Sequence, residues 1–98
     1  MTFSSESCVR EVTISHPEGL HTRPVMKFVD LAQRFRSEIR VTSSRNEHEV
    51  VDGKSAMELM LLGATAGTRL RIHAQGPDAR SAVDALVQLV DNRFDMHG

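Results

Sequence analysis

The stretch Gly19-Leu20-His21-Thr22-Arg23-Pro24 marks the point where a turn gives way to a helix. Pro24 suits the first turn of that helix, because its missing N–H group would have no intrahelical partner there. Beyond it, apolar side chains recur at the spacing of a helix with one buried face: Val25, Phe28, Val29, Ala32 and Phe35. The sequence therefore predicts an amphipathic helix that begins next to His21.

His21 and Arg23 would lie at the start of this helix, where backbone N–H groups without intrahelical partners favour an anion. A neutral imidazole nitrogen is a nucleophile toward phosphorus, and the planar Arg23 guanidinium can meet phosphate oxygens. The backbone N–H of Thr22 would add to the same anion site. We therefore predict that His21 carries a phosphoryl group. The residues alone do not choose between the two ring nitrogens.

Turn residues and alternating apolar residues divide the rest of the chain into short elements. Strands are predicted at 8–15, 38–42, 48–52 and 69–75, the middle two forming a hairpin. A short helix should start after Ser55, whose hydroxyl would cap it, with Glu58 completing a capping box and Gly63 ending it. A last helix should follow Asp78 as its N-cap and carry an apolar stripe that ends at Phe94. This β-α-β-β-α-β-α order predicts one sheet with helices on one face.

The composition argues against several classes of function. The 12 Lys and Arg residues nearly balance the 13 Asp and Glu residues, so bulk binding of nucleic acid is not expected. The chain has no Trp or Tyr to stack on bases, which also argues against an unrelated nucleic-acid-binding sandwich. The single cysteine, Cys8, excludes an intramolecular disulfide. Neither a signal peptide nor a membrane-spanning run is visible, so a cytoplasmic domain without direct membrane insertion is predicted.

No metal site and no cofactor are expected from the sequence. His16 and His21 do not form a pattern of ligands at short, converging spacings. The histidines other than His21 are interpreted as surface or strand residues: His16, His48, His73 and His97.

Two motifs in order make the chain resemble HPr, the histidine-containing phosphocarrier family of the phosphoenolpyruvate-dependent sugar phosphotransferase system. The first is the stretch 19–24; the second is Gly53-Lys54-Ser55-Ala56-Met57-Glu58-Leu59-Met60, followed by Leu62-Gly63 and Gly67-Thr68. The resemblance covers about residues 8–92 and implies a single HPr-like domain over 1–98. The implied fold is an α+β open-faced β-sandwich, a four-stranded antiparallel sheet with three helices on one face.

The resemblance also implies a role in sugar transport. Enzyme I would phosphorylate His21 on Nδ1, and His21 would pass the group to the IIA components of sugar-specific enzymes II. The protein would be a monomeric intermediate of phosphotransferases, not an enzyme. Partner docking is expected on a surface formed by Thr22, Val25, Ala56, Met57 and Met60.

Ser55 aligns with the serine that an HPr kinase/phosphorylase modifies in many members of the family. A capping serine is ordinary in any helix, so the structural and the regulatory roles of Ser55 both stay open. The alternative function is a regulatory HPr paralogue that signals through phospho-Ser55 bound to a transcriptional regulator, or through a nitrogen-type phosphotransferase branch.

Overall fold

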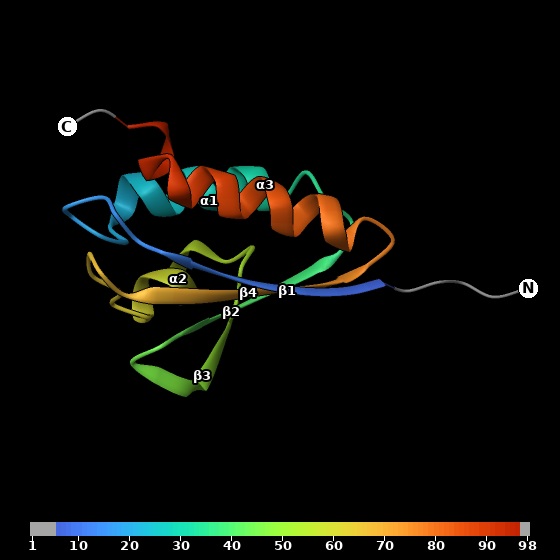
Figure 1. Ribbon diagram of the computed structural model, residues 1–98, viewed down its shortest axis with the longest axis horizontal. Coiled ribbons are helices and arrows are strands. Elements are labelled where there is room, and N and C mark those ends of the chain that lie inside the picture. Colours follow the sequence, from blue (N-terminus) through green and yellow to red (C-terminus); the bar gives the residue numbers. More distant parts are fainter. Residues whose placement is uncertain (1–5, 97–98) are drawn as a thin grey trace, which may run out of the picture.

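The computed structural model describes residues 6–96, which form one sheet with helices α1 and α3 packed across the same face (Figure 1). The strands are β1 (Glu6–Thr13), β2 (Glu38–Ser43), β3 (Asn46–Asp52) and β4 (Arg69–Gly76). The helices are α1 (Thr22–Ala32), α2 (Ala56–Leu61) and α3 (Ala79–Asp91), and a 3-10 turn, η1 (Arg93–Asp95), follows α3. The predicted order of elements is confirmed.

All strand pairs in the sheet are antiparallel, and the strand order is β1-β4-β2-β3. Strand β4 lies inside the sheet and alternates as predicted, with Leu70, Ile72 and Ala74 fully buried. Helix α3 packs on β1 and β4, whereas the short helix α2 packs against α1 and β3. The α+β open sheet with three helices is therefore confirmed. Within the described part of the chain, no helix is both long enough and apolar enough to cross a membrane.

Helix α1 has the buried face that the spacing predicted as far as Ala32, but Phe35, the last residue of the predicted stripe, lies beyond the helix and is partly buried. Val25, Phe28, Val29 and Ala32 are buried against the core, while Lys27 and other polar residues face solvent. Pro24 is the third residue of the helix, inside its first turn, where no N–H group is needed. Burial of this apolar face orients the helix, and it therefore fixes where the residues at its start must lie.

Phe94 is fully buried, as its place in the predicted apolar stripe requires, but it lies beyond the end of α3. Residues 93–95 all have positive φ angles, between 55 and 58°, so the chain leaves the helical path after Asp91. This left-handed segment places the Phe94 ring in the core, where its centroid is 6.5 Å from that of His16 in an edge-on arrangement.

Asp78 stands at the N-cap position of α3, as predicted, but its carboxylate makes no cap hydrogen bond. It instead accepts hydrogen bonds from the N–H groups of Arg36 and Ser37, both at 2.9 Å, and from the Ser37 hydroxyl at 2.6 Å. The Ser37 hydroxyl bond, followed by the Arg36 N–H bond, holds the pKa of Asp78 below its ordinary value. Asp78 thus ties the start of α3 to the loop between α1 and β2.

Replacing Asp78 by alanine is expected to lower the free energy of unfolding by about 1–2 kcal/mol near neutral pH, because three donors lose a charged acceptor. The pKa is lower in the folded state, so this stabilisation is complete above the ordinary Asp pKa of about 3.9. It is lost as the pH falls through the folded-state pKa.

Urea unfolding of wild type and Asp78→Ala at pH 7 and near pH 3 measures this change. The stability difference should shrink in acid. Asp30→Ala, a change at an exposed position of α1, is the control and should alter stability little. A difference that is equal at both pH values would contradict the role of the Asp78 charge.

Candidate functional site

His21 is the N-cap residue of α1, and its side chain is 34% exposed. Its backbone is extended, and its carbonyl accepts the first helical hydrogen bond from the N–H of Val25 at 3.0 Å. The imidazole does not cap the helix, so the N–H groups of Thr22 and Arg23 keep no intrahelical partner. The start of α1 therefore presents an imidazole beside two backbone donors and the positive end of the helix dipole.

The two nitrogens of the His21 ring lie in different environments. Nε2 lies 2.9 Å from Oε2 of Glu18, but it is buried and not aligned for a hydrogen bond with any described residue. An incoming group would reach this buried nitrogen less readily than the other ring nitrogen, Nδ1. The structure thus separates the two nitrogens, which the sequence alone could not do.

The loop that carries His21 is braced by the loop between α2 and β4. The Leu20 N–H donates to the carbonyl of Ala64 at 2.9 Å, and Gly67 N–H donates to the carbonyl of Ile14 at 2.8 Å. Gly19 has a φ angle of +67°, in the left-handed region where glycine is favoured. A Cβ atom there would lie only 2.6 Å from the Ala64 carbonyl oxygen. The first motif therefore packs against the loop that follows the helix of the second motif.

Thr22 and Arg23, the other two predicted site residues of the first motif, are the first two residues of α1. Both are exposed. Among residues 6–96, the Arg23 guanidinium takes part in no ion pair. It is therefore a cation that an incoming phosphate could engage without breaking an existing pair.

Ser55 is the N-cap residue of α2, as predicted, and its hydroxyl accepts a hydrogen bond from the Glu58 N–H at 3.2 Å. The capping box forms only in part. The Glu58 carboxylate accepts from the Asp52 N–H at 3.1 Å, whereas the Ser55 N–H donates to the Asp52 carbonyl. The box is displaced because the chain turns at residues 53–54 and brings Asp52 back to the helix start.

The expected docking surface is only partly exposed. Met57 and Met60 are 76% and 41% exposed, and Ala56 is partly buried. Val25 is 1% exposed and belongs to the core, so its prediction as a docking residue was wrong. Its place in the apolar stripe of α1 already indicated burial.

The sequence analysis missed two exposed apolar residues near these elements. Met26 on α1 and Leu61 on α2 are 46% and 70% exposed. Both lie outside the buried faces of their helices. Since α1 and α2 pack against each other, Met26, Met57, Met60 and Leu61 define the exposed apolar side chains of this helix pair.

His16 is the largest correction to the site. It was expected to be a surface or strand residue, but it is 2% exposed in the loop after β1, with its ring centroid 5.8 Å from that of His21. Its Nδ1 accepts a hydrogen bond from the Glu18 N–H at 3.2 Å. Of the other histidines, His48 lies in β3 and His73 in β4, as predicted, and His97 lies outside the described residues.

The turn at residues 16–19 therefore brings together side chains that were predicted to be unrelated. One potential ligand atom from each of His16, Glu18 and His21 lies within 4.8 Å of one from each of the others. The expectation that the two histidines do not converge was wrong. The cause is the reversal of the chain at Pro17 and Glu18, which closes a hydrogen bond from the Gly19 N–H to the His16 carbonyl.

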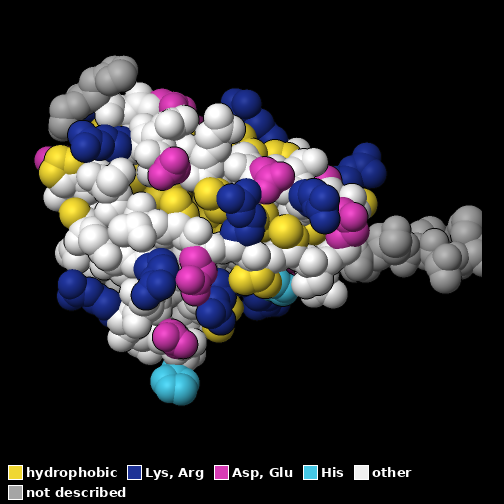
Figure 2. Space-filling model, viewed as in Figure 1, with side chains coloured by type: hydrophobic (Ala, Val, Ile, Leu, Met, Phe, Trp, Pro, Cys, Tyr) yellow, Lys and Arg dark blue, Asp and Glu magenta, His cyan; other side chains and the backbone are white. Residues whose placement is uncertain are grey.

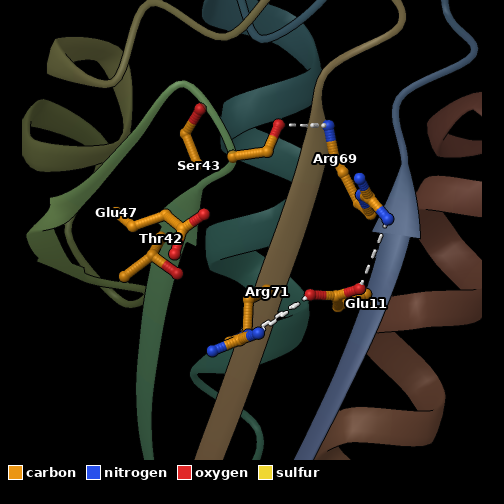
Figure 3. A pocket seen from close by; sticks show the side chains of 7 residues that line it. Glu11, Thr42, Ser43, Glu47, Arg69 and Arg71 are labelled. Carbon is orange, nitrogen blue, oxygen red and sulfur yellow. Dashed lines mark hydrogen bonds and ion pairs between the residues drawn. The ribbon is translucent and has the colours of Figure 1, made fainter.

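A shallow pocket lies away from His21, on the face of the sheet that carries no helix (Figure 3). In it, the Arg71 guanidinium lies 3.1 Å from the Glu11 carboxylate, and Arg69 lies 3.7 Å from the same group. The two cations therefore already share an anion. On the face drawn in Figure 2, acidic and basic side chains are likewise interspersed, not gathered into one patch. Seven residues line the pocket: Glu11, Thr42, Ser43, Ser44, Glu47, Arg69 and Arg71.

Comparison with protein families and with relatives agrees with this geometry. The family model described as "PTS HPr component phosphorylation site" matches residues 8–92. The chain is 46% identical over 85 residues to the phosphocarrier protein HPr of Pseudomonas aeruginosa, covering 87% of this chain and 92% of that protein. It is also 40% identical over 80 residues to the multiphosphoryl transfer protein of Haemophilus influenzae, covering 82% of this chain but 16% of that protein.

Solved structures show the same similarity. HPr-C-His from Thermoanaerobacter tengcongensis matches with a TM-score of 0.85 and 33% identity, over 93% of this chain and 99% of that one. The phosphocarrier protein HPr from Bacillus anthracis matches with a TM-score of 0.79 and 32% identity, over 86% and 96%. The protein thus belongs to the HPr family, the phosphocarriers of the phosphotransferase system, and is a phosphoryl carrier, not a catalyst.

Proposed function

We propose that this phosphocarrier works in the cytoplasm, accepting a phosphoryl group on Nδ1 of His21 from enzyme I and donating it to the IIA components of sugar-specific enzymes II. One observation carries the assignment. His21 stands at the start of α1 beside two N–H donors, with Nε2 buried, in a chain of the HPr family. Phosphoryl transfer asks a protein mainly for positioning and electrostatic stabilisation, and this helix start offers both.

In the accepting step, the lone pair of Nδ1 attacks the phosphorus atom of the phosphorylated enzyme I, and the bond from phosphorus to the donor breaks. The N–H groups of Thr22 and Arg23 and the Arg23 guanidinium stabilise the charge on the phosphoryl oxygens. The ring proton is on Nε2, next to the Glu18 carboxylate 2.9 Å away, which favours this tautomer electrostatically. With the proton on Nε2, the imidazole is also a good leaving group in the next transfer.

Docking requires a surface that both partners can reach. We propose that enzyme I and the IIA components contact the exposed apolar residues of α1 and α2 around Met57, Met60 and Ala56, together with Thr22. These helices pack against each other, and Met57 is the most exposed of the large apolar side chains among residues 6–96. Contacts that form and dissociate quickly suit a monomeric carrier that exchanges partners.

Replacing Arg23 by alanine should slow phosphorylation of His21 about tenfold or more, because a charge-assisted contact to the transferring group is lost. Arg23→Lys should recover part of the rate, since it restores the charge without the planar fork. The measurement is the initial rate with phosphoenolpyruvate and limiting enzyme I. Arg45→Ala, at an exposed turn between β2 and β3, is the control. Equal rates for all three proteins would exclude a role for Arg23.

We also propose that phosphorylation of Ser55 regulates docking. A phosphate on the Ser55 hydroxyl would place about two negative charges beside the proposed docking surface while remaining favourable for a helix N-terminus. It would therefore alter partner binding and leave the fold intact.

The pair Ser55→Ala and Ser55→Asp separates the capping role from the regulatory role. Ser55→Ala should lower the free energy of unfolding by about 1 kcal/mol and leave phosphorylation of His21 unchanged. Ser55→Asp keeps a capping side chain, so it should retain stability and raise the KM of enzyme I for this protein. Chemical denaturation and steady-state kinetics measure the two effects. An unchanged KM for Ser55→Asp would argue against the regulatory role.

The carrier function is tested by incubating the protein with phosphoenolpyruvate and its cognate enzyme I. We expect one acid-labile phosphate per chain, and phosphorus and nitrogen NMR should show that it is bound to Nδ1. The phosphate should leave the protein when a IIA component is added. Absence of incorporation would contradict the proposal and would favour the regulatory alternative, for which a protein kinase and ATP are the next assay.

A further inference from the structure

We propose that His16, Glu18 and His21 form a binding site for a divalent transition metal ion, for which Zn²⁺ fits best, and that a bound metal prevents phosphorylation of His21. The metal site stands on the geometry of three side chains. Its effect on phosphorylation rests on the proposed function, and the two parts can be tested separately.

The donor set and its spacing favour zinc. Two imidazoles and a carboxylate are a common set of three protein ligands for Zn²⁺, with a fourth position left for water. Their ligand atoms already lie within 4.8 Å of one another, and Glu18 Oε2 is 2.9 Å from His21 Nε2. Zinc bonds of about 2.0–2.2 Å place neighbouring tetrahedral ligands roughly 3.4 Å apart. Small side-chain rotations therefore suffice to complete the coordination.

The orphaned nitrogen of His21 independently points to a ligand at this position. Nε2 is buried and has no hydrogen-bond partner among the described residues, although a carboxylate oxygen is in reach. Buried polar atoms are normally satisfied. A cation bound by both the lone pair of Nε2 and the carboxylate would satisfy the two groups at once.

The other two ligands combine rigidity with access. The His16 ring is 2% exposed and packs edge-on with Phe94, so its position is set before a metal arrives. Because a neutral imidazole has one free lone pair, a metal bound to His16 would replace the hydrogen bond that its Nδ1 accepts from the Glu18 N–H. The Glu18 side chain is 66% exposed, which leaves a route from solvent and a negative charge to attract a cation. A fixed ligand and a movable acidic one suit reversible binding.

Coordination at Nε2 would oppose the accepting step by placing the ring proton on the wrong atom. A neutral imidazole that gives its Nε2 lone pair to a metal carries its proton on Nδ1. Nδ1 then has no lone pair to attack phosphorus. The metal also withdraws electron density from the ring and adds positive charge beside it. The zinc-bound protein would therefore accept a phosphoryl group slowly or not at all.

The site is tested by calorimetric titration of Zn²⁺ into the whole protein. A second titration uses Co²⁺ and records the visible absorption of the bound ion. One ion per chain is expected, with affinity lowered about tenfold or more in Glu18→Gln and in His16→Gln. His48→Gln and His73→Gln are matched controls that should bind as the wild type does. Since His16 is buried and its replacement can unfold the loop, exposed Glu18→Gln is the deciding variant. Binding that is absent, or that Glu18→Gln leaves unchanged, would overturn the site.

The effect on phosphorylation is measured as the rate of phosphate incorporation with and without Zn²⁺. Zn²⁺ should slow the wild type several-fold more than it slows Glu18→Gln. Zinc can also inhibit enzyme I itself, and that effect would slow both proteins equally. Equal slowing would contradict the proposed effect of the bound metal on phosphorylation of His21, whereas the metal titration would remain valid. If neither protein is phosphorylated without Zn²⁺, the carrier function fails, and the titration still decides whether the metal site exists.

Discussion

Alanine in place of His21 should reduce phosphate incorporation from phosphoenolpyruvate and enzyme I to the background level. The reaction requires a ring nitrogen with a free lone pair at the start of α1, and alanine supplies no nucleophile there. The fold should survive, because the His21 side chain makes no helix cap and is about one-third exposed. Unchanged circular dichroism with no acid-labile phosphate is the expected pair of results.

The control for this substitution is His48→Ala, which removes an exposed imidazole from β3. It should be phosphorylated at the rate of the wild type. Acid-labile phosphate that persists in His21→Ala would show that another residue accepts the group.

Gly19→Ala is the second substitution with a large expected effect, this time on stability as well as on transfer. The new Cβ atom would lie 2.6 Å from the Ala64 carbonyl oxygen and 2.8 Å from the Thr65 Cα atom. Both are backbone atoms that cannot turn away, and φ at this position is +67°. We expect a loss of about 3 kcal/mol or more in the free energy of unfolding, from left-handed strain and from separation of the two loops.

Gly63→Ala is a closely matched control for Gly19→Ala. Gly63 has a similar φ of +58°, but a Cβ atom there would meet nothing within 4 Å. Its replacement should lower the free energy of unfolding by about 1–2 kcal/mol, from the strain of a left-handed backbone alone. Urea denaturation measures both variants, and the difference between them isolates the contact with the Ala64–Thr65 backbone. Phosphorylation should also slow in Gly19→Ala, since His21 is two residues away. Equal losses in the two variants would contradict the steric argument.

The helices and the central strand were predictable because their signals are local. The spacing of Val25, Phe28, Val29 and Ala32 follows from the period of the α-helix alone, and the alternation through β4 follows from the period of the strand. The N-cap role of Ser55 depends on a hydroxyl and a backbone N–H three residues apart. The position of His21 at the start of α1 was predictable, since Pro24 and the apolar stripe locate the start of the helix beside it.

The features that the sequence analysis missed depend on segments distant in the chain or on how tightly a turn closes. Asp78 was interpreted as a helix cap, but its carboxylate binds Arg36 and Ser37, which lie 42 and 41 positions earlier in the chain. The burial of His16 depends on Phe94, which the left-handed turn after α3 brings back to the core. A count of residues between His16 and His21 could not show that a turn brings their rings together.

By itself, the sequence determined the order of strands and helices, the one buried face of α1 and the position of His21 at the start of that helix, because each depends on neighbours within two or three turns of chain. Only the tertiary structure decided the environment of that motif. It placed the buried His16 beside His21, and it placed the Glu18 carboxylate beside Nε2 of His21. These outcomes require non-local packing to exclude water and bring distant backbone segments together, which no local periodicity encodes.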